Sequence, residues 1–164
     1  MAIAPGQPIP AISVKHVTEA GVADASTTDI LGTGTVVMFT VPGAFTPTCH
    51  ANHLPGYLLT AEDFKAAGVD KIVCATANDH HVVRAWAEAT ESLGRIDFIA
   101  DGLAEFAKAT GLDRDLTAGG LGTRFGRHAL IIVDGVVHTV NTESAPGEVV
   151  ESGAPAMLDA LKAL

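Results

Sequence analysis

The sequence predicts an α/β fold in which helices cover both faces of a mixed central sheet. Two short runs, residues 35–41 and 71–76, are almost entirely apolar and rich in β-branched residues, as expected of strands buried on both faces. Helical patterns follow them, and Asp134-Gly135 separates two further apolar runs as the turn of a hairpin. Strands that alternate with helices and end in a hairpin indicate both parallel and antiparallel pairing.

The chain begins with an outer strand. Residues 10–17 alternate weakly between apolar and polar side chains, which indicates a strand with one exposed face. Residues 18–34 contain Thr, Asp, Ser and Gly, and we expect them to form turns. Residues 35–41 then form the first buried strand, where nearly every side chain is apolar.

A helix follows the first buried strand. Thr46 is a suitable N-cap, and Pro47 suits the first helical position, where a missing N–H costs nothing. The helix is predicted to run to about Ala67, with Gly68 as its C-terminal stop. Pro55 lies inside this span and is expected to kink or interrupt the helix, because proline removes a backbone hydrogen bond.

The middle of the chain repeats the strand and helix pattern. Residues 71–76 form the second buried strand, and Asp79 caps a helix whose apolar side chains share one face. A short strand is expected at residues 97–100. It is followed by a short helix at residues 103–110, which ends at a glycine.

A hairpin and a helix close the chain. Residues 127–133 and 136–141 flank the hairpin turn, and residues 154–164 carry apolar side chains at helical spacing. The thioredoxin-like fold satisfies this order of elements. In open α/β sheets the chemistry gathers at the carboxyl ends of the strands, and residues 42–49 begin at such an end.

Cys49 is the candidate reactive residue. It is one of two cysteines, and it falls in the first turn of the helix that starts at Pro47. Its thiol would lie near free backbone N–H groups and the positive end of the helix dipole. That environment favours the reactive thiolate. The second cysteine, Cys74, lies inside an apolar strand and is expected to be an unreactive core thiol.

The length and composition of the chain limit the classes of function that it can have. The length suits one domain, and we expect a single domain over residues 1–164. The net charge of -9 argues against a nucleic-acid or anionic-membrane partner, because phosphates are bound by Lys and Arg. No apolar run approaches the length of a membrane span, and the N-terminus lacks the pattern of a signal peptide. We therefore expect a cytoplasmic protein, in line with only two cysteines.

The candidate cysteine lies in a longer motif. The spacing Pro42-x-x-x-Thr46-x-x-Cys49 resembles the active-site motif of the peroxiredoxins. With its flanking residues, from Val41 through Tyr57, the run resembles the type 5 (plant type II) subgroup. The likeness continues over nearly the whole chain, in the runs 74–79, 85–86, 101–102, 120–131 and 134–137.

The resemblance implies an activity and roles for four residues. The family reduces hydrogen peroxide and organic hydroperoxides with a cysteine, without a metal or a bound organic cofactor. Cys49 would be the peroxidatic cysteine, Thr46 and Arg127 would hold the peroxide, and Pro42 would shield the site. Arg124 is the competing choice for the arginine, because it lies slightly earlier in the same run.

The resemblance also bears on how the oxidised cysteine is recycled. Type 5 relatives with an internal resolving cysteine carry it just before the last helix, where this chain has Glu151. We therefore expect a one-cysteine cycle, in which an external thiol attacks the sulfenic acid of Cys49. Glutathione with glutaredoxin is the expected reductant and thioredoxin the second. A thioredoxin-recycled enzyme that uses Cys74 as its resolving residue is an alternative.

Two further alternatives belong to other classes. A peroxide sensor or redox-signalling protein would use the same sulfenic acid, and only turnover separates it from an enzyme. A zinc site at Cys49-His50-x-x-His53 has suitable ligand types but a weak spacing and no obvious fourth ligand.

The resemblance finally implies a homodimer. In the family, the loop after Asp79 lies near the dimer contact. This chain carries His80 and His81 there, where relatives often have a small residue or proline and then phenylalanine. Because histidine titrates near neutrality, these residues bear on the strength of the dimer and on its response to pH.

Overall fold

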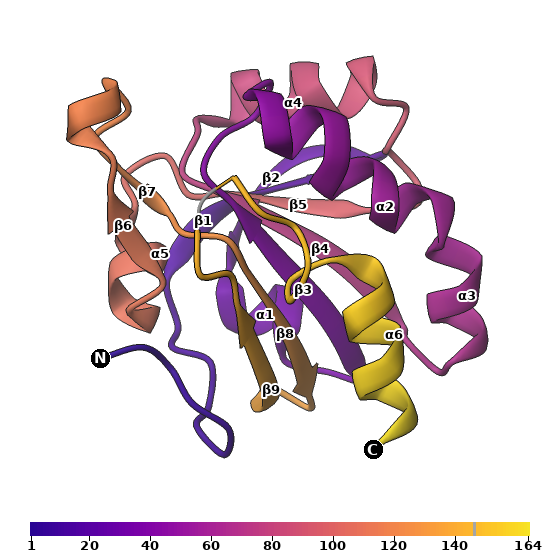
Figure 1. Ribbon diagram of the computed structural model, residues 1–164. Coiled ribbons are helices and arrows are strands. Elements are labelled where there is room, and N and C mark those ends of the chain that lie inside the picture. Colours follow the sequence, from indigo (N-terminus) through magenta and orange to yellow (C-terminus); the bar gives the residue numbers. More distant parts are fainter. Residues whose placement is uncertain (146) are drawn as a thin grey trace.

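A seven-stranded sheet forms the centre of the computed structural model, which describes residues 1–145 and 147–164 (Figure 1). Its strands are β1 (Ser13–Thr18), β2 (Gly21–Ser26), β3 (Thr35–Val41), β4 (Lys71–Thr76), β5 (Asp97–Ala100), β8 (His128–Val133) and β9 (Val136–Thr142). Their order is β2-β1-β5-β4-β3-β8-β9. The pairs β3–β4 and β4–β5 are parallel and the others antiparallel, which confirms the predicted mixed sheet.

Helices cover both faces of this sheet. One face carries α2 (Leu54–Leu59), α3 (Ala61–Ala66), α4 (His80–Ala89) and α6 (Ala154–Lys162), and the other carries α1 (Thr27–Leu31) and α5 (Glu105–Thr110). The central strands contribute to both layers because successive side chains of a strand point to opposite faces. Phe39 of β3 belongs to the first core layer, and its neighbour Met38 belongs to the second.

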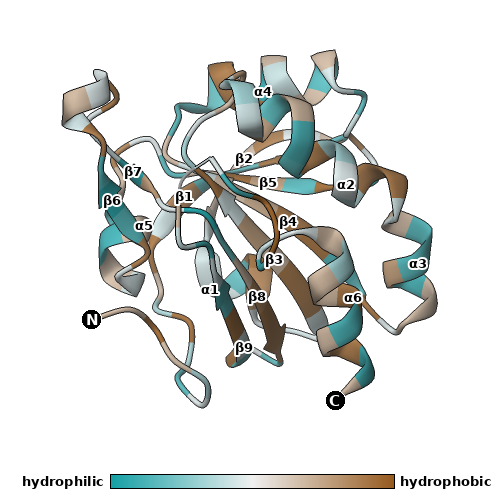
Figure 2. Cartoon of the chain, in the orientation of Figure 1, coloured by the Kyte–Doolittle hydropathy of each residue, from teal (hydrophilic) through white to brown (hydrophobic). Residues whose placement is uncertain are grey.

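The buried strands are the parts that the sequence predicted best. Six of the seven residues of β3 are buried, β4 shows the same pattern, and most side chains of both strands are apolar (Figure 2). Full burial of one large apolar side chain stabilises the fold by about 1.5–3 kcal/mol. The predicted hairpin is also confirmed: Asp134 and Gly135 both have positive φ, at 47° and 80°, as the tight turn requires.

Residues 18–34 differ from the expectation of turns alone, because β2 and α1 lie there. The strand β2 pairs with β1 along the edge of the sheet, and its small alternating side chains gave a weak signal. The helix α1 starts at a capping box. The side chain of Ser26 accepts a hydrogen bond from the backbone of the first turn, and the side chain of Asp29 accepts one from the backbone N–H of Ser26. Such a box stabilises a helix that is too short to show apolar periodicity.

The long helix predicted from Pro47 to Ala67 is interrupted, as the proline suggested. A π-helical turn, η1 (Cys49–His53), is followed by α2 and then, after a break at Thr60, by α3. The backbone N–H of Leu54 donates to the carbonyl of Cys49, which widens this turn. Pro55 has no N–H to donate, and it lies at the start of α2, where none is needed.

The sequence missed a second, smaller sheet between residues 111 and 126. The strands β6 (Asp113–Asp115) and β7 (Thr123–Phe125) pair antiparallel, and a 3₁₀ turn, η2 (Thr117–Gly119), connects them. This β6–β7 arm, made of the two strands and η2, lies at the upper left of Figure 1. Strands of three residues carry too little periodicity to be recognised. In the part of the chain that the structure describes, no helix has the length and apolar character needed to cross a membrane.

Candidate active site

The candidate site lies at the carboxyl end of β3. The chain leaves the strand at Val41 and turns at Phe45, which has a positive φ of 61°, before the helical turns begin. The first of these is closed by the N–H of His50, which donates to the carbonyl of Thr46 at 2.9 Å. Cys49 follows Thr46 in this turn, and its side chain is fully buried. The predicted strand-to-helix junction is therefore present.

Antiparallel pairing brings a second segment to the same place. Thr40 of β3 is paired with His128 of β8, so the residue before β8 lies beside the end of β3. The Thr40 hydroxyl donates to the carbonyl of Gly126 at 2.7 Å and accepts from the N–H of His128 at 3.1 Å. These two bonds hold the backbone on either side of Arg127.

Arg127 faces the sulfur of Cys49. Its Nη2 donates to Sγ at 3.2 Å, and its Nη1 donates to Nδ1 of His53 at 2.9 Å. Only 4% of Arg127 is exposed, so this permanent charge is largely shielded from water. A guanidinium at this distance can stabilise negative charge that develops beside it, because opposite charges attract strongly where solvent is excluded.

His53 is neutral and has a defined tautomer. Since arginine can only donate, Nδ1 of His53 accepts, and its proton lies on Nε2, which donates to the carbonyl of Ser152 at 3.0 Å. The pKa of His53 is lowered to about 4: burial is the largest cause and the charge of Arg127 adds to it, while the Ser152 carbonyl and Glu143 partly offset both. The ring therefore links Arg127 to the segment before α6.

Thr46 directly precedes the first helical residue, Pro47, as predicted, but its side chain does not cap the helix. Its hydroxyl donates to the carbonyl of Gly43 at 2.6 Å instead of accepting from a helical N–H. Its single proton is committed to this bond, so the hydroxyl oxygen is left as an acceptor towards a substrate. The hydroxyl can therefore relay a hydrogen bond from a substrate to the backbone.

The loop that carries Pro42 is held from two sides. Nη1 of Arg124 donates to the Pro42 carbonyl at 3.1 Å, and its Nε donates to the carbonyl of Leu121 at 3.0 Å. On the other side, Oδ1 of Asn78 accepts from the N–H of Ala44 at 2.9 Å. Arg124, the competing choice of arginine, thus holds the loop, whereas Arg127 contacts the sulfur.

Cys74 occupies the middle of the sheet. It is fully buried in β4, opposite Phe39 of β3 on one side and Phe98 of β5 on the other. Burial raises the pKa of its thiol well above the ordinary value, and the neighbouring Cys49 raises it further. Cys74 therefore remains a protonated thiol at neutral pH, in agreement with the expected unreactive core residue.

The residues of the weak zinc pattern have other partners. Nδ1 of His50 accepts from Nε1 of Trp86 at 3.0 Å, and both ring nitrogens of His53 are engaged with Arg127 and Ser152. Among residues 1–145 and 147–164, no group of three or more potential metal ligands is gathered.

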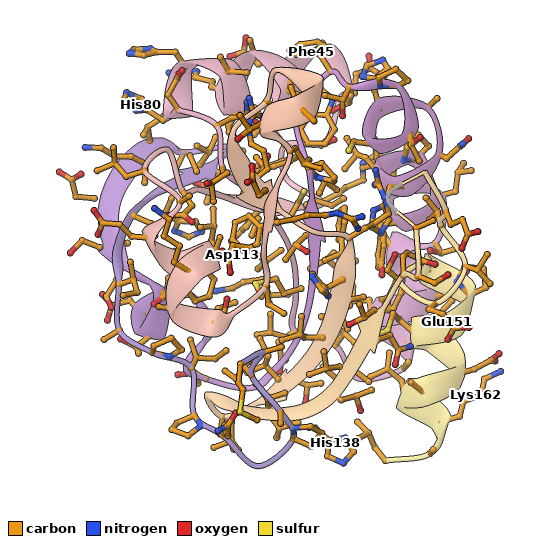
Figure 3. The ribbon with its side chains drawn as sticks, turned by 60° about the vertical axis from the view of Figure 1, so that its left-hand side comes forward. Phe45, His80, Asp113, His138, Glu151 and Lys162 are labelled. Carbon is orange, nitrogen blue, oxygen red and sulfur yellow. The ribbon has the colours of Figure 1, made fainter. Side chains whose placement is uncertain are left out.

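His80 and His81 lie at the start of α4 with ring centroids 4.1 Å apart. Figure 3 places His80 and Phe45 towards the same end of the molecule, away from His138. Phe45 is 50% exposed, and Leu103, which follows β5, is 77% exposed. Because β3 and β5 run parallel to β4, the loops that carry these residues lie at one edge of the sheet.

Three polar residues of the site escaped the sequence analysis. Thr40 was assigned only to an apolar strand, His53 only to a weak metal pattern, and Glu143 to nothing. A polar residue inside an otherwise buried strand is a signal that it serves a hydrogen bond, and this would have singled out Thr40. The partners of His53 and Glu143 are separated from them by too much chain for a local signal.

Comparisons with known proteins agree on one family. A family model described as Redoxin matches residues 4–158. Peroxiredoxin-2B of Arabidopsis thaliana is 44% identical over 126 residues, and Peroxiredoxin-2C of Oryza sativa subsp. japonica is 45% identical over the same length, 77% of each chain in both cases. The crystal structure of reduced Prx3 in complex with hydrogen peroxide from Vibrio vulnificus has a TM-score of 0.90 at 44% identity and covers 97% of this chain and 99% of that one.

Proposed function

Because the chain belongs to the peroxiredoxins of the plant type II group, and is thus a thiol-dependent peroxidase, we propose that Cys49 is its peroxidatic residue. The substrate of such an enzyme is a hydroperoxide, and a thiol reduces the enzyme afterwards. The observation that carries the proposal is the 3.2 Å contact between Nη2 of Arg127 and Sγ of Cys49. The other cysteine, Cys74, has its thiol protonated and its backbone fixed inside the sheet.

The proposed first step oxidises Cys49. Its thiolate attacks one peroxide oxygen, an S–O bond forms, the O–O bond breaks, and the electron pair leaves with the other oxygen as hydroxide or alkoxide. The leaving hydroxide or alkoxide then takes a proton and becomes water or an alcohol. Cys49 is left as a sulfenic acid. Arg127 stabilises the thiolate before the attack and the developing negative charge during it.

Thr46 and Pro42 shape the site for this step. Since the Thr46 hydroxyl donates to the Gly43 carbonyl, it accepts from the peroxide O–H and orients the O–O bond towards the sulfur. Pro42 is buried and has no N–H, so it closes one side of the site without adding a competing donor. Arg124 holds the backbone of Pro42 through its carbonyl.

The proposed second step uses an external thiol. Glutathione attacks the sulfenic sulfur, a mixed disulfide forms and water leaves; a second glutathione then releases reduced Cys49 and oxidised glutathione, with glutaredoxin as catalyst. Glu151 stands before α6, where some relatives carry a resolving cysteine. Because Cys49 exposes no surface, a small thiol reaches it with less rearrangement of η1 than a protein thiol such as that of thioredoxin.

A resolving role for Cys74 is disfavoured by its place in the fold. It pairs with strands on both sides, so moving it towards Cys49 would break the centre of the sheet. Its pKa, raised by burial, also leaves little thiolate to attack the sulfenic acid.

Stopped-flow measurement of peroxide consumption tests these steps. Cys49→Ser should be inactive, whereas Cys74→Ser should retain nearly the wild-type rate with glutathione and glutaredoxin. A strong loss in Cys74→Ser would overturn the one-cysteine cycle. A single stoichiometric oxidation of the wild type, without turnover by glutathione or thioredoxin, would indicate a peroxide sensor instead.

We also propose that residues 1–164 act as one domain that forms a homodimer in the cytoplasm. The exposed Phe45 and Leu103 lie at one edge of the sheet, and exposed apolar side chains that gather in this way are typical of interfaces. Sedimentation velocity should show a dimer that Leu103→Glu dissociates. A monomeric wild type at micromolar concentration would contradict the proposal.

A further inference from the structure

A buried carboxylate lies behind the site, outside the residues that would touch substrate. Glu143 follows β9 and is only 7% exposed. Its backbone N–H donates to the carbonyl of Arg127 at 3.1 Å, which ties the two residues together at the level of the main chain. The segment from residue 147 to residue 153 then returns over this carboxylate before α6 begins.

The carboxylate organises the return of the chain. Oε2 of Glu143 accepts three hydrogen bonds: from the N–H of Val150 at 2.8 Å, and from the N–H and the hydroxyl of Ser152, both at 2.6 Å. Burial alone would raise the pKa of Glu143. The hydrogen bonds from Ser152 and Val150, together with the nearby backbone N–H of Glu151, outweigh burial and lower the pKa, so the group is ionised at neutral pH.

Ser152 connects Glu143 to the site through its backbone carbonyl. Its carbonyl accepts from Nε2 of His53 at 3.0 Å and from the Tyr57 hydroxyl at 2.7 Å. His53 in turn accepts from Nη1 of Arg127, whose Nη2 contacts the sulfur of Cys49. A continuous chain of hydrogen bonds therefore runs from Glu143 to the reacting atom, and each member has its donor and acceptor roles fixed by its neighbours.

We infer that Glu143 is a positioning residue for the peroxidase reaction, which acts through Ser152 and His53 on the guanidinium of Arg127. Glu143 does not touch the sulfur or the substrate. It holds the Ser152 carbonyl at the place where neutral His53 can donate to it and still accept from Arg127. This inference rests on the roles proposed above for Cys49 and Arg127.

The test compares the rate constant for oxidation of Cys49 by hydrogen peroxide in several variants of the full chain. Glu143→Ala removes all three hydrogen bonds and is expected to lower the rate constant about tenfold or more, because small displacements of a charge-stabilising group are costly. Glu143→Gln keeps an oxygen acceptor at the same reach and should restore at least about half of the wild-type rate constant. Glu148→Ala is the matched control: it alters an exposed glutamate of the same segment, whose carboxylate accepts from the Ser144 hydroxyl, and it should leave the rate unchanged.

A double-mutant cycle separates positioning from a general loss of structure. In an Arg127→Gln background, Glu143→Ala should lower the rate by less than about twofold, since the guanidinium on which it acts is gone. Its effect on the thermal midpoint should be similar in both backgrounds. Ser152→Ala, which removes one of the three bonds, provides a milder variant if Glu143→Ala does not fold, and should slow the wild type but not the Arg127→Gln enzyme.

The outcomes are distinct. Equal rate losses in the two backgrounds, or Glu143→Gln as slow as Glu143→Ala, would overturn the positioning role. A normal rate constant in Glu143→Ala, with Arg127→Gln impaired, would overturn this inference alone. A normal rate constant in Arg127→Gln would overturn the proposed role of Arg127 and the inference with it.

Discussion

Replacement of His53 by glutamine should change how the stability of the protein depends on pH. His53 is fully buried, and its pKa of about 4 lies below the ordinary 6.5, first because of burial and then because of Arg127. In the unfolded chain the ring binds a proton near pH 6.5, whereas in the folded protein it stays neutral until about pH 4. The unfolded state therefore binds more protons over this interval, and stability must fall as the pH is lowered.

The magnitude follows from the two pKa values. At about 1.4 kcal/mol for each pH unit, the difference between 6.5 and about 4 corresponds to about 3 kcal/mol of unfolding free energy. This contribution is complete above pH 6.5 and is lost progressively down to pH 4. About 2 kcal/mol of it disappears between pH 7 and pH 5. A glutamine side chain has no proton to gain in this range, so the His53→Gln variant lacks this part of the pH dependence.

The assay is urea unfolding of the wild type and His53→Gln at several pH values from 7 to 5, with the free energy extrapolated to water. The difference between the two proteins should shrink by about 2 kcal/mol as the pH falls. The same substitution at His138, an exposed residue of β9, serves as the matched control for the loss of one histidine. A difference that stays constant, or that grows towards pH 5, would refute the reasoning that His53 is buried and neutral.

Three other substitutions test the loop and the helix start. Gly43→Ala would place a Cβ 2.9 Å from Nη1 of Arg124 and 2.9 Å from Cγ2 of Thr46, so we expect about 1–3 kcal/mol of destabilisation in urea unfolding and a slower peroxide reaction. An unchanged rate would show that the loop tolerates displacement. Thr46→Val should slow peroxide consumption about tenfold or more by removing the acceptor, and Thr46→Ser should restore it; equal loss in both would exclude the hydroxyl as the cause. Asp79→Ala removes the N-cap bond to Val82 at 3.0 Å and should lower the unfolding free energy by about 1 kcal/mol, measured at pH 7 against wild type.

Local sequence patterns determined a large part of the fold. The strands β3 and β4, the hairpin at Asp134-Gly135 and the cap at Asp79 were predictable because each depends on apolar periodicity or on one turn of chain. The same approach failed for β2, α1 and the β6–β7 arm. Those elements are short. Pairing with a neighbouring strand stabilises β2, β6 and β7 more than their own composition does, and α1 depends on its capping box.

The residues of the site also differ in whether local sequence could place them. The sequence by itself placed Cys49, Thr46 and Pro42 together, since all three lie within one strand-to-helix junction and their spacing is local. It left Arg127 and Arg124 as alternatives. Only the tertiary structure assigned the first to the sulfur and the second to the loop, because the antiparallel register of β3 with β8 decides which arginine reaches Sγ.

The tertiary structure alone decided how that arginine is held. Thr40 fixes the backbone around it from the neighbouring strand, 88 residues before His128. His53 and Ser152, which lie 99 residues apart, meet behind its guanidinium. Apolar periodicity records which face of an element is buried, but it carries no record of which distant polar group a buried donor will meet. That choice is made when the sheet closes, because each buried donor or acceptor must then find a partner within hydrogen-bonding distance.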